Sequence, residues 1–177
     1  RRQVAAVAPN PAHHAIAALE ARLPGTLLVT QNVDGLHQRA GSVDAVEFHG
    51  NLFTNRCRDC GHAAPQPDPE LAAPPACPNC GELMGPGVVW FGEAIPAQAL
   101  ERACRGASEA DMLLAVGTSG LVTPAAALPE VARRAGALVV ELNLDTTPLS
   151  AQADFVVTGP AALSLPALAA SLADNRP

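Results

Sequence analysis

The sequence predicts an α/β fold, in which helices cover both faces of a parallel sheet, with one small insert. Short apolar runs of strand length alternate along the chain with stretches whose apolar residues recur at helical spacing. The connections between the apolar runs are long enough for helical crossovers, which parallel strands require. Between residues 55 and 85 this alternation stops, and the chain becomes rich in proline and cysteine. We therefore expect one domain built from residues 1–54 and 86–177, with residues 55–85 as a separate module.

The first long helix is predicted to begin at Asn10-Pro11, because Asn caps helices well and Pro suits the first helical position. Ile16, Leu19 and Leu23 then recur at helical spacing. The other elements follow from the same kinds of pattern. Strands are expected at 27–30, 46–48, 88–90, 112–116, 138–142 and 155–157, and helical segments at 36–39, 97–107, 124–134 and 165–172.

Composition and charge argue against several classes of protein. Hydrophobic residues make up 49% of the 177 residues, so a real core can form. All 11 basic residues are Arg, the net charge is −6, and the positive charges form no cluster, which argues against a nucleic-acid partner. These residues contain no signal-peptide pattern and no apolar run long enough to cross a bilayer. We expect a cytoplasmic monomer without a membrane partner.

Four of the five cysteines form two CxxC pairs separated by sixteen residues. In each pair a Gly follows the second Cys and permits the tight turn that directs backbone N–H groups at a thiolate. Four thiolates complete a tetrahedral zinc shell without an open position, so the metal would be structural. A redox dithiol pair, or cysteines without any metal, are the alternatives. The spacing favours one structural Zn²⁺ ion bound by Cys57, Cys60, Cys77 and Cys80, while Cys104 is expected to be a buried small hydrophobe on a helix face.

Polar residues follow three of the predicted strands. Gln31, Asn32 and Asp34 come directly after the first strand, Gly-Thr-Ser occupies 117–119, and Glu-Leu-Asn occupies 141–143 at the end of the apolar run that starts at 138. In open parallel sheets, ligands bind beyond the carboxyl ends of the strands. Amide, carboxylate and hydroxyl groups suit a ribose or a carboxamide. Alternatively, Asp34 only caps the helical turn that follows it. Taken together, the three strand ends predict a nucleotide-binding crevice.

His49 follows the predicted strand at 46–48. An imidazole at a strand end beside such a crevice can act as a general base, because its ordinary pKa lies near neutrality. A purely structural histidine is the alternative. Three of the other histidines, His13, His14 and His62, are expected to have surface or local roles.

Several motifs occur in a fixed order along the chain. They are TQNVDGLH (30–37), FHG (48–50), the two CxxCG knuckles, GVVWFGE (87–93), GTS (117–119) with VTPAA (122–126), and ELN (141–143). In this set and order the sequence resembles the sirtuins, from about Pro9 to Ala161. The resemblance implies a Rossmann-like NAD-binding domain, incomplete at its N-terminus, with an inserted zinc-ribbon module. It also implies NAD-dependent removal of acyl groups from lysine side chains of proteins or peptides, giving nicotinamide and O-acyl-ADP-ribose.

The resemblance further implies roles for individual residues. His49 would be the general base that acts on the ribose hydroxyls. The nicotinamide and its ribose would contact Gln31, Asn32 and Asp34. The remaining NAD contacts would come from Gly117, Thr118, Ser119, Asn143, Leu144, Asp145 and Ala161. The acyl-lysine peptide would lie along a strand edge formed by Val88, Val89, Trp90, Phe91, Gly92 and Glu93.

Two features of the sirtuins are missing from these 177 residues. The Gly-rich loop that binds the pyrophosphate would precede residue 1, so we expect this chain alone to bind NAD poorly and to be inactive. GVVWFGE and GTSGLVTPAAA resemble the branch that removes succinyl and malonyl groups, but the Tyr and Arg that recognise those groups would also precede residue 1. Deacetylation and ADP-ribosyl transfer to protein are therefore alternatives.

An alternative from a different class is a non-catalytic zinc-ribbon adaptor that binds peptides. It explains the paired cysteines and the peptide-binding edge. It does not explain three polar strand ends together with His49.

Overall fold

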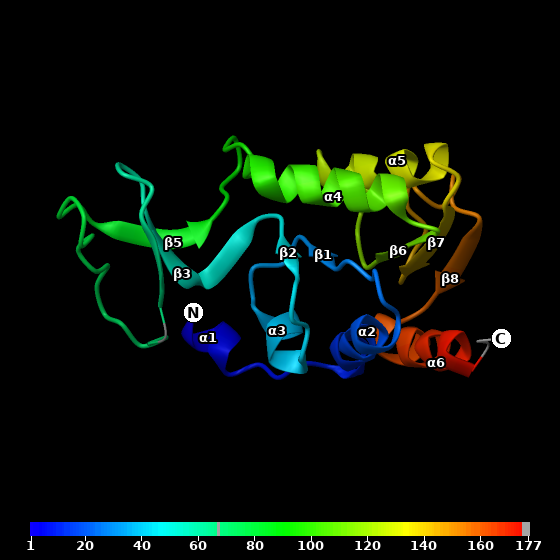
Figure 1. Cartoon of the computed structure of the whole chain (residues 1–177). Helices are drawn as coiled ribbons and strands as arrows, with labels where there is room; N and C mark the ends of the chain where they lie inside the picture. Colours follow the sequence, from blue (N-terminus) through cyan, green and yellow to red (C-terminus); the bar gives the residue numbers. More distant parts are fainter. Residues whose placement is uncertain (67, 175–177) are drawn as a thin grey trace.

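The computed structural model describes residues 1–66 and 68–174, so Pro67 of the predicted 55–85 module and residues 175–177 lie outside it. Figure 1 shows an elongated arrangement with three small sheets along its length. The elements follow the chain as α1 (Arg2–Ala5), α2 (Pro11–Arg22), β1 (Val29–Thr30), α3 (Leu36–Ala40), β2 (Val46–Glu47), β3 (Gly50–Cys57), β4 (Ala63–Pro65), β5 (Met84–Val88), α4 (Ala97–Glu109), β6 (Met112–Val116), the 3-10 turn η1 (Ala125–Ala127), α5 (Leu128–Arg134), β7 (Leu138–Asn143), β8 (Phe155–Thr158) and α6 (Ala161–Asp174).

Parallel pairing, as predicted, joins the strands that alternate with helices. β1 pairs with β2, and β6, β7 and β8 form a second sheet in that order. The five strands therefore fall into two hydrogen-bonded sheets. In the second sheet Met112 lies opposite Leu138 and Val140 opposite Phe155, so all three strands end at the same edge. This common edge brings the residues after β6, β7 and β8 close together.

The third sheet is antiparallel and has the order β4-β3-β5. Cys57 is the last residue of β3, and the other three paired cysteines lie outside the strands. The sheet lies at the end of the molecule away from β6–β8 (Figure 1). The strand predicted at 88–90 is wrong: β5 ends at Val88, which lies opposite Gly50 of β3. Pairing with β3 determines where β5 runs, so the apolar run Val88-Val89-Trp90 was a misleading signal. The sheet spans residues 50–88, and the domain boundaries at 54/55 and 85/86 stay a prediction.

Helices form the outer layers. α4 and α5 lie on one side of the strands, and α1, α2, α3 and α6 on the other (Figure 1). One core cluster packs Phe48, which is fully buried, against small side chains such as Ala103 of α4 and Ala132 of α5. A second packs α2 and α6 against the sheet of β6–β8. Cys104 packs against the first cluster as predicted, but it is only partly buried rather than buried.

Local signals at the helix ends behave as predicted for α2. The Asn10 side chain accepts hydrogen bonds from the amides of Ala12 and His13, and Pro11 is the first helical residue. α3 ends at Gly41, whose φ of 112° is a left-handed conformation that favours glycine. The helix predicted at 124–134 instead begins with η1 and becomes α-helical only at Leu128. α6 starts earlier than the predicted 165, at Ala161.

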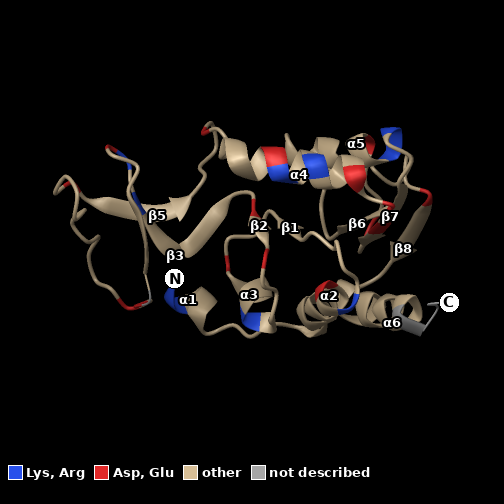
Figure 2. Ribbon diagram, viewed as in Figure 1, with Lys and Arg blue, Asp and Glu red and all other residues tan. Residues whose placement is uncertain are grey.

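Charged residues are dispersed over the fold. Figure 2 shows basic and acidic segments interspersed along α4 and scattered over the other elements. Among the described residues, none of the helices has the length and apolarity needed to cross a membrane.

Candidate functional site

A chain of hydrogen bonds joins the ends of β1, β2, β6 and β7. The Nδ1 atom of His49 lies 3.0 Å from the carbonyl oxygen of Gln31. The Gln31 side chain donates to Oγ1 of Thr118 at 3.3 Å, and Nδ2 of Asn143 donates to the Thr118 carbonyl at 2.7 Å. Four residues predicted as site residues from separate segments therefore lie together. Their polar side chains stand at the carboxyl edge of the strands, where parallel sheets bind ligands.

The hydrogen bond of His49 determines its tautomer. A carbonyl oxygen only accepts, so Nδ1 carries a proton, and in the neutral ring Nε2 is the nitrogen with the free lone pair. Nε2 has no hydrogen-bond partner among the described residues. His49 follows β2 and precedes Gly50, the first residue of β3. The site thus contains a partly exposed imidazole nitrogen that can take up a proton.

Asp34 and Asn32 lie on the segment between β1 and α3. Oδ1 of Asp34 accepts from the Leu36 amide at 2.9 Å, which is the capping interaction considered as the alternative for this residue. The other carboxylate oxygen makes no hydrogen bond within the described part of the chain, so capping and ligand binding are compatible. Asn32 is exposed, and its own amide donates to Oγ1 of Thr30 at 3.1 Å.

The residues after β6 and β7 form two further loops at this edge. Ser119 is exposed, and its hydroxyl accepts from the Leu121 amide at 3.3 Å. Gly117 has a φ of 59° and donates its amide to the Leu142 carbonyl, which joins the two loops. Leu144 and Asp145 are exposed, and Ala161 packs against the core at the start of α6. No hydrogen bond within the described residues links Asp145 or Ala161 to His49, Gln31 or Thr118.

A tight turn follows β5. The Val89 amide donates to the His49 carbonyl at 2.9 Å, so this segment begins beside the backbone of His49. The Glu93 amide donates to the Trp90 carbonyl at 2.9 Å and closes a turn in which Gly92 has a φ of 86°. The Trp90 side chain is 56% exposed and Phe91 is fully exposed. Two aromatic side chains are thus presented to solvent in the residues that follow Val89.

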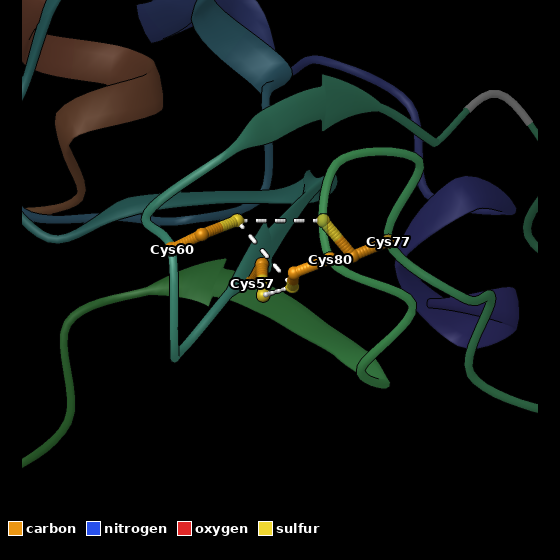
Figure 3. A group of neighbouring side chains, drawn as sticks. All are labelled: Cys57, Cys60, Cys77 and Cys80. Atoms are coloured by element: carbon orange, nitrogen blue, oxygen red, sulfur yellow. Dashed lines mark hydrogen bonds between the residues drawn. The ribbon is translucent and has the colours of Figure 1, made fainter.

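The four cysteines converge at the antiparallel sheet (Figure 3). Their Sγ atoms all lie within 4.8 Å of one another, with separations of 3.5 Å for Cys57–Cys80 and for Cys60–Cys77. A tetrahedral Zn²⁺ with Zn–S bonds of about 2.3 Å holds its sulfurs about 3.8 Å apart, so the cluster fits one ion. Each CxxC turn is closed by the amide of the following glycine, Gly61 or Gly81, which donates to the carbonyl of the first cysteine.

The electrostatics of the thiols also suit a cation. Burial opposes ionisation of Cys77, but the amides of Asn79 and Cys80 together with neighbouring thiols outweigh it and lower its pKa to about 7. The Glu82 amide favours the Cys80 thiolate, yet the crowded sulfurs of the cluster raise the pKa of Cys80 to about 12. Formation of one thiolate therefore makes ionisation of the neighbouring thiols less favourable. A metal ion bound by all four sulfurs would compensate the repulsion between their negative charges.

The sequence motifs include two residues, Glu141 and Gly50, whose structural roles were not predicted. Glu141 of β7 has a fully buried side chain, and its two oxygens accept from the hydroxyls of Thr147 and Ser150, each at 2.5 Å. It therefore holds the loop after β7. Gly50 has a φ of 75°, and a Cβ there would lie 2.0 Å from the Gly87 carbonyl oxygen. The sequence offered one signal for each residue. Glu141 is a charged residue inside an apolar strand, and Gly50 directly follows a histidine.

The parallel sheets, the polar strand ends and the four-thiol cluster define an α/β protein of the Rossmann-like class with a four-cysteine metal module. Comparison with known proteins gives its family. The model of the Sir2 family matches residues 1–124, and the chain belongs to that family.

Curated relatives are similar over nearly the whole chain. A protein of Ralstonia nicotianae named NAD-dependent protein deacylase is 50% identical over 174 residues, which cover 96% of this chain and 69% of the relative. A protein of the same name from Aquifex aeolicus is 48% identical, over 87% of this chain and 65% of the relative. NAD-dependent protein deacylase 1 of Pseudomonas aeruginosa is 47% identical, over 95% and 70%. The chain thus spans about two thirds of the length of these relatives.

Solved structures have the same fold. The crystal structure of a Sir2 homologue–NAD complex superposes with a TM-score of 0.91 at 40% identity, covering 97% of this chain and 68% of that one. A Sir2 mutant in complex with 2'-O-acetyl ADP ribose gives a TM-score of 0.90 at 39% identity, covering 97% and 70%. A Sir2–p53 peptide–NAD⁺ complex gives 0.82 at 33% identity, covering 97% and 72%.

Proposed function

We propose that this protein is an NAD-dependent protein deacylase that removes acyl groups from lysine side chains. The observation that carries the proposal is the hydrogen-bonded series from His49 through Gln31 and Thr118 to Asn143. It unites an imidazole with an unprotonated Nε2 and the amide and hydroxyl groups of three strand ends. The relatives named as deacylases and the Sir2 homologue structures with NAD and acetyl-ADP-ribose support the same function.

The two sides of the crevice bind different parts of NAD. Gln31, Asn32 and Asp34 stand on the β1 side and suit the nicotinamide carboxamide and its ribose. Residues 117–119 and 143–145 stand on the β6–β7 side and suit the second ribose and the adenine. When bound, NAD supplies an electrophilic ribose carbon from which nicotinamide leaves. Ala161 at the start of α6 is proposed to lie near the adenine.

His49 acts on the ribose hydroxyls. Its Nδ1 is fixed by the Gln31 carbonyl, so the ring is oriented and Nε2 is the atom that accepts the proton. This arrangement uses one nitrogen for positioning and the other for chemistry. With NAD bound, Nε2 would accept the proton of a ribose hydroxyl, and that oxygen would receive the acyl group as its bond to the lysine nitrogen breaks, with nicotinamide released and one water consumed overall.

The acyl-lysine peptide lies along Val88–Glu93. Val89 donates its amide to the His49 carbonyl, so a peptide bound at this turn brings its acyl group to the crevice. Main-chain hydrogen bonds depend little on the side chains of the bound peptide. Recognition of this kind suits an enzyme with many protein substrates. The acyl group itself, succinyl, malonyl or acetyl, stays a prediction, as do a cytoplasmic location and a monomeric state.

Replacing His49 by Asn tests this function in the protein at its full natural length. The Asn Nδ2 atom can still donate to the Gln31 carbonyl, but no group replaces Nε2. We expect the turnover of acyl-lysine peptides to fall about 10²–10⁴-fold while NAD binding is retained. Deacylated peptide and O-acyl-ADP-ribose are measured by mass spectrometry, and NAD binding by titration calorimetry.

His14→Asn is the matched control, because His14 lies on α2 and away from the crevice. It should leave both measurements unchanged. Turnover by His49→Asn at the wild-type rate would refute the role of His49. Absence of saturable NAD binding in the unmodified protein would refute the enzyme and favour a peptide-binding adaptor.

A further inference from the structure

Glu93 joins the zinc module to the turn after β5. Its Oε1 lies 2.6 Å from an Arg58 nitrogen, and its Oε2 lies 2.9 Å from Arg56. The same Oε2 accepts from the Trp90 amide at 3.1 Å. Arg56 and Arg58 flank Cys57, the first cysteine of the cluster. One carboxylate therefore connects both neighbours of a metal ligand to the two ends of the Trp90–Glu93 turn.

The arginines also hold the strand that leads into the turn. Arg58 donates to the carbonyls of Pro86 and Val88 at 3.4 and 3.3 Å, and Arg56 approaches the Val88 carbonyl at 3.5 Å. Isolated surface ion pairs contribute little. Here two guanidinium groups share one carboxylate and each side chain is only about a third exposed (31%, 36% and 36%), so fixing one partner already restricts the others.

Little else holds the turn in place. Trp90 and Phe91 face solvent rather than the core, and residues 91–94 are exposed. Apart from the contacts of Glu93, the described hydrogen bonds of the turn are the backbone bonds of Val89 and Glu93. The position of the turn therefore depends on where Arg56 and Arg58 stand. Arg56 pairs with Ala63 of β4 and Gly85 of β5. Arg58 lies beyond the end of β3, and both arginines adjoin Cys57, which is buried and belongs to the thiol cluster.

We infer that Arg56 and Arg58 are positioning residues, which couple the occupancy of the four-cysteine site by zinc to the conformation of the Trp90–Glu93 turn. Zinc fixes the backbone at Cys57, and the two flanking guanidinium groups fix Glu93. The consequence for acyl-peptide binding rests on the function proposed above, whereas the coupling itself does not. Loss of the metal would then weaken the peptide site through these side chains without a change in the NAD-binding residues.

The double variant Arg56→Gln/Arg58→Gln tests the coupling, because it removes both ion pairs and no thiol. Trp90 is the one tryptophan of the sequence, and its fluorescence reports on the turn. A Trp90→Phe protein supplies the background signal from the full-length protein. Arg134→Gln is the matched control, since Arg134 forms an ion pair with Glu130 on the remote helix α5. Arg58→Lys keeps one charged contact and should restore part of the wild-type behaviour.

Three quantities are measured for each protein: zinc content, quenching of Trp90 by acrylamide, and KM for the acyl peptide and for NAD. We expect the double variant to keep one zinc ion, to show stronger Trp90 quenching, and to have a peptide KM raised roughly fivefold with an unchanged KM for NAD. Chelation of zinc should raise quenching in the wild type, but add little in the double variant because the connection is already broken.

Wild-type quenching and peptide KM in a zinc-loaded double variant would overturn the inference. So would loss of zinc from the double variant, because the arginines would then maintain the metal site rather than transmit its state. An equal effect of chelation in both proteins would also overturn it. If the quenching results are as expected but the wild type shows no NAD-dependent deacylation, the proposed function fails and the coupling stands.

Discussion

Replacing Glu141 by Ala is expected to destabilise the protein and release the loop after β7. The Glu141 side chain is 0% exposed, and its carboxylate accepts from the Thr147 and Ser150 hydroxyls. Those hydroxyls in turn accept from the amides of Leu149 and Thr147, at 3.1 and 2.8 Å. The carboxylate thus completes a network that folds residues 147–150 back onto β7.

The expected magnitude follows from this network. Each hydroxyl that loses its buried acceptor costs about 1–3 kcal/mol, and relief from desolvating a carboxylate offsets part of the sum. A net loss of about 2–4 kcal/mol lowers the melting temperature of a domain of this size by about 4–16 °C. Glu141→Gln keeps the volume and can bond both hydroxyls, so its loss should be near 1 kcal/mol.

Thermal unfolding followed by circular dichroism measures these losses. Glu130→Ala is the control, because Glu130 forms partly exposed ion pairs with Arg133 and Arg134 and should cost at most about 1 kcal/mol. The double variant Thr147→Val/Ser150→Ala removes the same hydrogen bonds by replacing the two hydroxyl donors instead of the carboxylate acceptor. If Glu141→Ala melts at the temperature of Glu130→Ala, the assigned role of the buried carboxylate is wrong.

Two further predictions concern Gly50 and the neighbouring histidines His13 and His37. Gly50→Ala should lower the free energy of unfolding in urea by more than about 3 kcal/mol, because its Cβ would meet the Gly87 carbonyl. Gly25 has a similar φ of 88° but open space around it, so Gly25→Ala should lower the free energy of unfolding by only about 1 kcal/mol. Equal losses for the two variants would contradict the steric argument. The His13 and His37 rings lie 4.8 Å apart, and burial lowers the pKa of both below the ordinary 6.5, with Asp34 opposing it. Their contribution to stability should therefore be complete above pH 6.5 and decline as the pH falls through the lowered pKa values. The free energy of unfolding is measured with urea at pH 5–8. Below pH 6.5 it should decline less steeply with falling pH in the double variant His13→Gln/His37→Gln than in the wild type. Identical slopes of unfolding free energy against pH would contradict the prediction.

Elements with strong local signals were predictable from the sequence. The cap at Asn10 and the apolar runs at 112–116 and 138–142 gave α2, β6 and β7 with nearly correct bounds. β3 was not predicted, because Asn51, Thr54 and Asn55 give it no alternating apolar pattern. Its stability comes from pairing with β4 and β5 and from the cysteine cluster, which are contacts between residues distant in sequence.

At the candidate site, too, local sequence signals were predictable and contacts between residues distant in sequence were not. The residue types at the strand ends predicted a crevice, and the spacing of the cysteines predicted the metal cluster. No sequence pattern indicated that Nδ1 of His49 meets the Gln31 carbonyl, or that Arg56 and Arg58 meet Glu93. Such contacts depend on how β1, β3 and β5 are placed in space, and a single sequence does not give that placement.

The Gln31–Thr118 side-chain bond has a mechanical consequence. Among the described residues it links the end of β1 to the end of β6 at the carboxyl edge. Val29 of β1 and Leu113 of β6 also pack against one hydrophobic cluster, the one that contains Phe48. Apolar packing and this polar contact therefore hold the two strand groups at a fixed spacing, so a bound molecule has to adapt its conformation to the sheet edge rather than displace it.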